Sequence, residues 1–182
     1  MRDPLFLLIL MGLAVVALAS HPALADEEDA VTAHPFLPLF RKWASTYRVP
    51  WRWLMALSIV ESSEGKNRAV ARGLADPTDV AGSTSSDGKS WGLEQLTVAT
   101  ASALEGRPVS PVELNDPDES VKLAAQLLRE LIDRFGLEDP ESVFRAYNGG
   151  PGFGAATYPY WLKISAALAQ VQAEFPGDQL ET

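Results

Sequence analysis

The sequence has 182 residues and a formal net charge of −9, and 47% of its residues are hydrophobic. This composition is typical of a globular protein, and the acidity argues against nucleic acid or an anionic membrane surface as the main partner. Cysteine is absent and there are two histidines, which excludes disulfides and thiol catalysis and argues against a Ser-His-Asp triad or a multi-histidine zinc site.

Residues 1–25 have the layout of a secretory signal peptide. Arg2 precedes an apolar run from Leu5 to about Leu18, and Ala-Leu-Ala at 23–25 forms a small-x-small cleavage site. The run is shorter than the roughly 20 residues that span a bilayer, although an uncleaved membrane anchor is the alternative. No cysteine follows it, which excludes a bacterial lipoprotein. We therefore expect an exported protein, periplasmic or extracellular, that meets a membrane only if this segment is uncleaved.

The rest of the chain is predicted to form one mainly α domain over 36–175, between a flexible segment at 26–35 and a tail at 176–182. Apolar spacing and cap residues predict helices over 36–47, 49–65, 91–104, 115–136, 139–150 and 158–175. Residues 66–90 are rich in Gly, Ser, Asp and Thr and predict a long loop, which in a compact domain is more often functional than idle. No stretch shows convincing strand alternation.

Cap residues predict where two of these helices begin and end. Asn115 or Asp116 can cap the clearest helix, and Gly136 is expected to end it. The helix that starts near Pro50 is expected to stop at Gly65. Apolar residues fall nearly all round this second helix, which predicts a central, buried position.

The second helix leads into a carboxylate. Glu61 shares a helix face with a mostly apolar set of residues, Leu54, Leu57 and Ser58. Partial removal from water disfavours the ionised form and raises the pKa of a carboxyl, as a general acid near neutral pH requires. Glycoside cleavage is the reaction most associated with such a residue. The alternative is a solvent-facing glutamate at a helix end, which is what we expect of Glu64.

Three short motifs follow one another along the chain: Glu-Ser at 61–62, Gly-Leu-Glu-Gln at 92–95 and Ala-Tyr-Asn-Gly-Gly at 146–150. In this order, on an α-helical, exported chain without cysteine, they resemble the soluble lytic transglycosylase domain of the goose-type lysozyme-like group. The resemblance covers about 36–175. It implies a single lysozyme-like helical domain with a substrate cleft.

The resemblance implies a role for each matching residue. Glu61 matches the single catalytic acid/base of the family. Gln95 matches the glutamine of a Gly-Leu-Met-Gln motif that lines the sugar cleft, and Ser86 matches a serine that precedes this motif.

Three further positions are implied to lie at the site. Tyr147 and Asn148 match the Ala-Tyr-Asn motif, in which the tyrosine lies near the catalytic glutamate and the asparagine contacts substrate. Tyr160 matches a tyrosine shortly before the last helix that also lines the site. Taken singly, Tyr147 is also an ordinary core aromatic, and Asn148-Gly149 an ordinary helix stop.

The implied activity is cleavage of the bond between N-acetylmuramic acid and N-acetylglucosamine in peptidoglycan strands, with formation of 1,6-anhydromuramic acid. The nucleophile is the 6-hydroxyl of the substrate, so one protein carboxylate suffices, whereas ordinary glycosidases need a pair. We expect no metal and no cofactor, and we expect peptidoglycan glycan strands as the partner.

Two departures from the family keep alternatives open. Glu94 stands where the family has methionine, and the loop at 66–90 lengthens the spacing between Glu61 and Gln95. A true hydrolase of the lysozyme or chitinase type would pair Glu61 with Glu94, Glu64 or Asp87. A glycan-binding or secretion-scaffold protein would keep the cleft without turnover.

Overall fold

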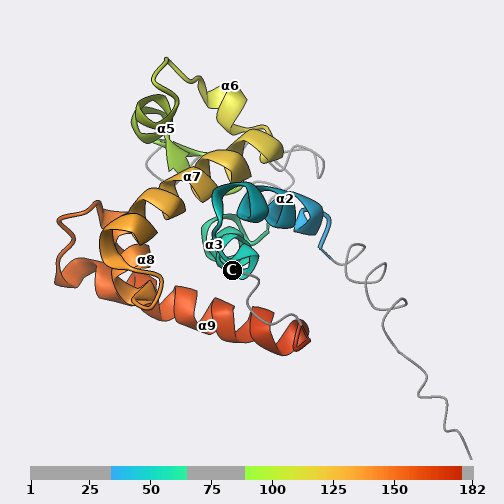
Figure 1. Cartoon of the computed structure of the whole chain (residues 1–182). Coiled ribbons are helices and arrows are strands. Elements are labelled where there is room, and N and C mark those ends of the chain that lie inside the picture. The colour runs from blue at the N-terminus through green and yellow to red at the C-terminus, as the bar shows by residue number, and fades with distance from the viewer. Residues whose placement is uncertain (1–33, 65–88, 178–182) are drawn as a thin grey trace, which may run out of the picture.

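The computed structural model describes residues 34–64 and 89–177, which form a mainly helical single domain, as predicted (Figure 1). The expected signal peptide, Ser86 and Asp87 lie outside the described residues, and the boundaries of the flanking segments stay predictions. None of the helices that the structure describes is long and apolar enough to cross a membrane.

The helices of the described chain are α2 (Leu37–Tyr47), α3 (Trp51–Ser62), α5 (Val98–Glu105), α6 (Pro111–Leu114), α7 (Pro117–Phe135), α8 (Pro140–Gly149) and α9 (Tyr158–Glu174), and a 3-10 turn, η1 (Ala155–Thr157), precedes α9. Two short strands, β1 (Ser90–Trp91) and β2 (Leu96–Thr97), pair antiparallel, with Ser90 opposite Thr97 and Trp91 opposite Leu96.

Helix α3 lies at the centre of the domain and packs against α9, α2 and α7 (Figure 1). Every residue from Trp51 to Ser58 is buried, as expected for a helix that is apolar nearly all round. The helix ends at Ser62, before the predicted stop at Gly65. Ser63 takes a left-handed φ of 55°, and the N–H of Glu64 donates to the carbonyl of Ser58 at 3.0 Å, which closes the helix early.

Helix α7 follows its sequence signals closely. Asp116, one of the two predicted caps, accepts a hydrogen bond from the N–H of Asp118 at 2.9 Å. The helix ends before Gly136, which has a φ of 93°. Its apolar face is buried at Val121, Ala124, Ala125, Leu128, Leu131 and Ile132, and Phe135 at its end is partly buried. Local capping and periodicity are therefore enough to define this element.

The predicted helix over 91–104 is wrong in its first half. Residues 90–97 form the β1–β2 hairpin, and α5 begins only at Val98. Thr97 caps α5, because its side chain accepts a hydrogen bond from the N–H of Thr100 at 3.1 Å. The Gly-Leu-Glu-Gln motif therefore lies in a tight turn and not on a helix.

Contacts remote in sequence fix this turn over 92–95. Gly92 has a φ of 80°, and a Cβ placed on it would lie 1.8 Å from the carbonyl oxygen of Leu114 and 2.8 Å from Ser120 Oγ. Gln95 also takes a left-handed φ, of 50°. The N–H of Glu94 donates to Ser120 Oγ at 3.1 Å. The end of α6 and the first turns of α7 thus hold the hairpin.

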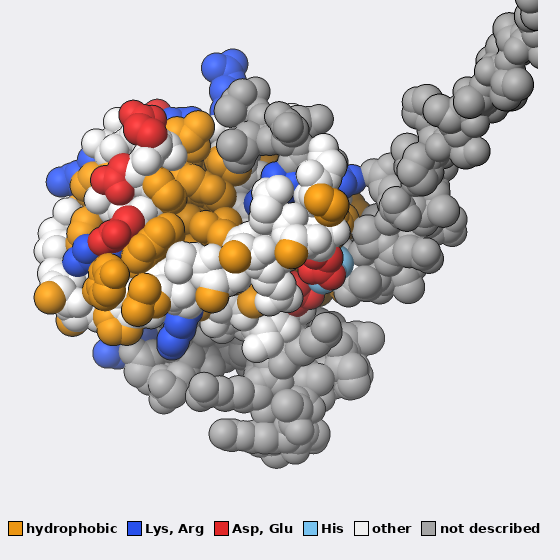
Figure 2. Space-filling model, turned by 90° about the horizontal axis from the view of Figure 1, so that it is seen from below, with side chains coloured by type: hydrophobic (Ala, Val, Ile, Leu, Met, Phe, Trp, Pro, Cys, Tyr) orange, Lys and Arg blue, Asp and Glu red, His pale blue; other side chains and the backbone are white. Residues whose placement is uncertain are grey.

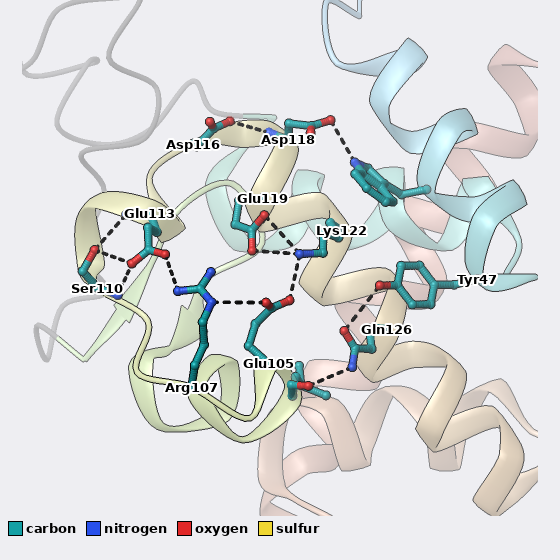
Figure 3. Close-up of polar contacts among 12 residues, drawn as sticks. Tyr47, Glu105, Arg107, Ser110, Glu113, Asp116, Asp118, Glu119, Lys122 and Gln126 are labelled. Atoms are coloured by element: carbon teal, nitrogen blue, oxygen red, sulfur yellow. Dashed lines mark hydrogen bonds and ion pairs between the residues drawn. The ribbon is translucent and has the colours of Figure 1, made fainter.

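A chain of ion pairs joins α5 and α6 to α7 (Figure 3). Ser110 and Glu113 form a capping box at the start of α6. Arg107 pairs with Glu113 at 2.6 Å and with Glu105 at 3.5 Å, and Lys122 of α7 pairs with Glu105 at 2.7 Å. Exposed pairs stabilise little one by one. Together these contacts connect the elements that surround the 92–95 turn.

One face of the domain carries exposed apolar side chains. Figure 2 shows hydrophobic side chains gathered on the left of the face seen from below, the side where α8 and the start of α9 lie in Figure 1. Tyr158 and Leu162 of α9 are 46% and 51% exposed. The guanidinium of Arg145 lies over the rings of Phe153 and Tyr158, 4.8 and 5.7 Å from their centroids, so a cation borders this apolar surface.

Gly92→Ala is expected to lower the free energy of unfolding by about 3 kcal/mol or more, because the new methyl group would clash with backbone on α6. Gly106→Ala is the matched control. Gly106 also has a positive φ, of 65°, but nothing lies within 4 Å of its Cβ position. Only the left-handed backbone then opposes the change, at about 1–2 kcal/mol. Urea denaturation measures both, and equal losses would contradict close packing at Gly92.

Candidate active site

Side chains from four elements converge around Glu61. Glu61 lies in the last turn of α3, Glu94 in the β1–β2 turn, Tyr147 on α8 and Tyr160 on α9. The hydroxyl of Tyr160 donates a hydrogen bond of 2.6 Å to Glu61 Oε1. The packing of α9 along α3 thus brings together two residues that are distant in the sequence.

The pKa of Glu61 is raised from its ordinary value to about 7. Burial is the main cause, since it disfavours the ionised form. The hydrogen bond from Tyr160 and the positive charge of Lys163 act in the opposite direction and lower the pKa. The predicted apolar stripe beneath Glu61 is present, because Leu54, Leu57 and Ser58 are fully buried. Near neutral pH, Glu61 is therefore poised between its acid and carboxylate forms.

Tyr147 lies near Glu61, as the resemblance implies, but it is not the residue that bonds the carboxyl. The hydrogen bond to Glu61 comes from Tyr160, while the hydroxyl of Tyr147 donates to the main-chain carbonyl of Glu94 at 3.0 Å. Burial and the nearby carboxyl groups of Glu94 and Glu61 raise the pKa of Tyr147 well above its usual range. The residue is neutral and links α8 to the 92–95 turn.

The other predicted contact residues lie at different depths. Gln95 is partly buried, and its side-chain Nε2 donates to the carbonyl of Gly92 at 2.8 Å, which supports the turn. Asn148 is exposed on α8, next to Tyr147. Trp51 and Trp53 are 8% and 7% exposed and belong to the core, so neither offers a sugar-stacking surface.

Glu94 is the unexpected member of the site. The residue is fully buried, and neither carboxyl oxygen has a hydrogen-bond partner among the residues that the structure describes. Burial, and secondly the charge of Glu61, raise the pKa of Glu94 well above its ordinary value. The sequence shows Glu94 as a departure from the family motif. Its burial depends on the β1–β2 hairpin, which the sequence does not predict.

Glu64 is not the solvated residue that we expected. Its side chain is 10% exposed, and its carboxylate lies 3.1 Å from His34 Nδ1. His34 Nε2 lies 2.7 Å from a carboxylate oxygen of Glu174. Burial lowers the pKa of His34, but the hydrogen bonds and charges of Glu174 and Glu64 outweigh it, so the pKa is raised overall. Glu64 is thus engaged by an imidazole that joins α3 to the end of α9.

The chemistry available to this arrangement is acid–base chemistry. A carboxyl with a pKa of about 7 can both give and take a proton near neutral pH. The tyrosine hydroxyls around it supply hydrogen bonds without adding charge. No cluster of three or more His, Asp or Glu side chains able to hold a metal occurs in residues 34–64 and 89–177.

The family model of the transglycosylase SLT domain matches residues 38–162, more than half of the chain. The match confirms the resemblance that the three motifs predict, and it includes all four residues that converge at the site. No curated protein is significantly similar to the chain.

Tyr160→Phe is expected to raise the pKa of Glu61 further, by about 1. The hydroxyl stabilises the ionised carboxylate, so its removal favours the protonated form. A pH titration followed by ¹³C NMR of labelled glutamate carboxyl groups measures the shift, with Glu61→Gln to assign the signal. Tyr158→Phe is the control, since Tyr158 is a half-exposed tyrosine of the same helix. A Glu61 pKa that is unchanged or lowered in Tyr160→Phe would contradict this contact.

Proposed function

Because the chain belongs to the transglycosylase SLT domain family, we propose that it is a lytic transglycosylase that cleaves the β-1,4 bond between N-acetylmuramic acid and N-acetylglucosamine in peptidoglycan strands. The observation that carries the proposal is the state of Glu61. Its carboxyl has a pKa of about 7, is partly withdrawn from water and is bonded by Tyr160. A single group of this kind can serve as both acid and base.

In the first step, protonated Glu61 donates its proton to the glycosidic oxygen. The bond from this oxygen to the anomeric carbon of muramic acid breaks, and the leaving sugar takes the proton. Positive charge develops on the ring while Glu61 becomes a carboxylate. The hydrogen bond from Tyr160 and the charge of Lys163 stabilise Glu61 in this ionised form.

In the second step, the Glu61 carboxylate accepts the proton of the muramic acid 6-hydroxyl. The oxygen of that hydroxyl bonds to the anomeric carbon, which gives the 1,6-anhydro product and returns Glu61 to its acid form. The substrate supplies the nucleophile, so the protein needs no second ionised carboxylate. Glu94, the described carboxyl group that interacts with Glu61 in the site, has a raised pKa that favours its neutral form, which supports this route over a carboxylate pair.

The positions of the other carboxyl groups argue against the hydrolase alternative. Glu94 is fully buried and its pKa is raised, so it is poorly placed to activate water as a base. Glu64 is held by His34. Asp87 lies outside the described residues. Neither described candidate therefore supports a second catalytic carboxylate.

We propose that Asn148 contacts the glycan directly, since it is exposed beside Tyr147. Gln95, supported by the 92–95 turn, and Ser86 are proposed to line the cleft with it. Tyr147 is proposed to act mainly by holding Glu94 and the turn against α8. The substrate is an exported polymer, so we propose that residues 1–25 direct the protein to the periplasm or the cell exterior.

Digestion of purified peptidoglycan sacculi followed by mass spectrometry tests the proposal. The wild-type protein is expected to release 1,6-anhydromuropeptides, and Glu61→Gln to lose about 100-fold or more of this activity. Glu130→Gln is the matched control, because Glu130 is an exposed glutamate on α7. Products with free reducing ends would favour a hydrolase, and glycan binding without turnover would favour a binding protein. Either result would overturn the proposal.

A further inference from the structure

Glu94 places a carboxyl group inside the described core. It is 0% exposed, and neither of its oxygens has a hydrogen-bond partner within 34–64 and 89–177. Buried polar groups without partners are rare, because each forfeits its hydration without compensation. An apolar side chain of similar size would avoid this cost. The position therefore calls for a role that methionine or leucine would not fill.

The backbone of Glu94 is fixed from two sides. Its N–H donates to Ser120 Oγ on α7 at 3.1 Å, and its carbonyl accepts from the Tyr147 hydroxyl on α8 at 3.0 Å. The flanking residues Leu93 and Leu96 are 1% and 3% exposed. The carboxyl cannot reach solvent without disrupting the turn, so its position in the site is fixed.

The groups around Glu94 favour its neutral form. Glu61 of α3 acts on it through its negative charge when ionised, and Tyr147 of α8 and Tyr160 of α9 add hydroxyls that stay protonated. Ser120 of α7 contributes an uncharged hydroxyl. The positive charge of Lys163 of α9 acts on Glu61. No described cation contributes to the pKa shift of Glu94. An unpaired buried carboxylate would be far more costly than a buried acid, so ionisation of Glu61 leaves Glu94 protonated.

We propose that Glu94 is a positioning residue, a neutral carboxylic acid near Glu61 that sets how strongly Glu61 holds its proton and does not touch the substrate. The dipole of the neutral acid gives the ionised form of Glu61 a second polar neighbour, beside the hydroxyl of Tyr160. The benefit to the reaction rests on the proposed function, in which Glu61 must release and regain a proton. The arrangement lowers the stability of the fold, because the acid has no hydrogen-bond partner in the described part of the chain.

Two replacements of similar length separate this role from a merely structural one. Glu94→Gln keeps a neutral polar group, so the pKa of Glu61 is expected to stay close to its wild-type value. Glu94→Met removes the polar neighbour, so the pKa of Glu61 is expected to rise by about 1. Glu94→Met is also expected to melt at a higher temperature than the wild type, because an unpartnered buried polar group is lost.

The test is a ¹³C NMR titration of labelled glutamate carboxyl groups in the wild type and both variants, with Glu61→Gln and Glu94→Gln assigning the two signals. In the wild type, the Glu94 signal is expected to keep the chemical shift of a protonated acid at pH 7. The dependence of kcat/KM on pH should then move upward in Glu94→Met and stay in place in Glu94→Gln.

Three results would overturn the inference. The first is an ionised Glu94 at pH 7, and the second is an unchanged Glu61 pKa in Glu94→Met. The third is a Glu61 pKa lowered by about 1 in Glu94→Gln, because this would mean that the substitution removed a like charge. The wild-type and Glu94→Gln measurements decide the matter even if Glu94→Met fails to fold. The titration needs no substrate, so its outcome is separate from that of the sacculus digestion.

Discussion

The burial of α3 is the constraint on which the site depends. This helix packs against α2, α7 and α9 and is buried from Trp51 to Ser58, and Glu61 lies one turn after the end of this buried run. The same packing that stabilises the core therefore withdraws a carboxyl from water and raises its pKa to about 7. Helix α3 ends at Ser62, so Glu61 still lies in regular helix. Glu64 lies beyond the helix end, and its carboxylate contacts His34.

The second element of the site is a hairpin that stability alone would not favour. Its turn contains a left-handed residue that is not glycine, Gln95, and a buried acid, Glu94, whose oxygens have no hydrogen-bond partner among the described residues. Such features cost free energy and persist where the surrounding structure holds them. Ser120 and Tyr147 do so from α7 and α8. The packed helices thus compensate for the unfavourable features beside Glu61.

The sequence is sufficient where structure is decided locally and fails where distant contacts decide it. Helix α7 carries its own cap and apolar face, and was predicted almost to the residue. The sequence predicts a helix over the 92–95 turn, which is wrong. The turn packs against Leu114 and Ser120, and these contacts are remote in the sequence, so no local pattern indicates them. The capping box formed by Ser110 and Glu113 is a local signal for α6, although no helix is predicted there. The apolar face and the three ordered motifs together indicate Glu61 as the candidate acid/base, but its hydrogen bond to Tyr160 depends on how α9 packs on α3.

The most direct measurement is the stability of Glu61→Gln relative to the wild type as a function of pH. The folded pKa of Glu61 lies above its unfolded value, so the folded protein binds more protons and loses stability as the pH rises from about 4.5 to about 7. The Gln variant lacks this loss, so urea denaturation should show its relative stability rising by about 2 kcal/mol across that range. Glu130→Gln should show no such trend. A difference between Glu61→Gln and wild type that is independent of pH would contradict a carboxyl held out of water.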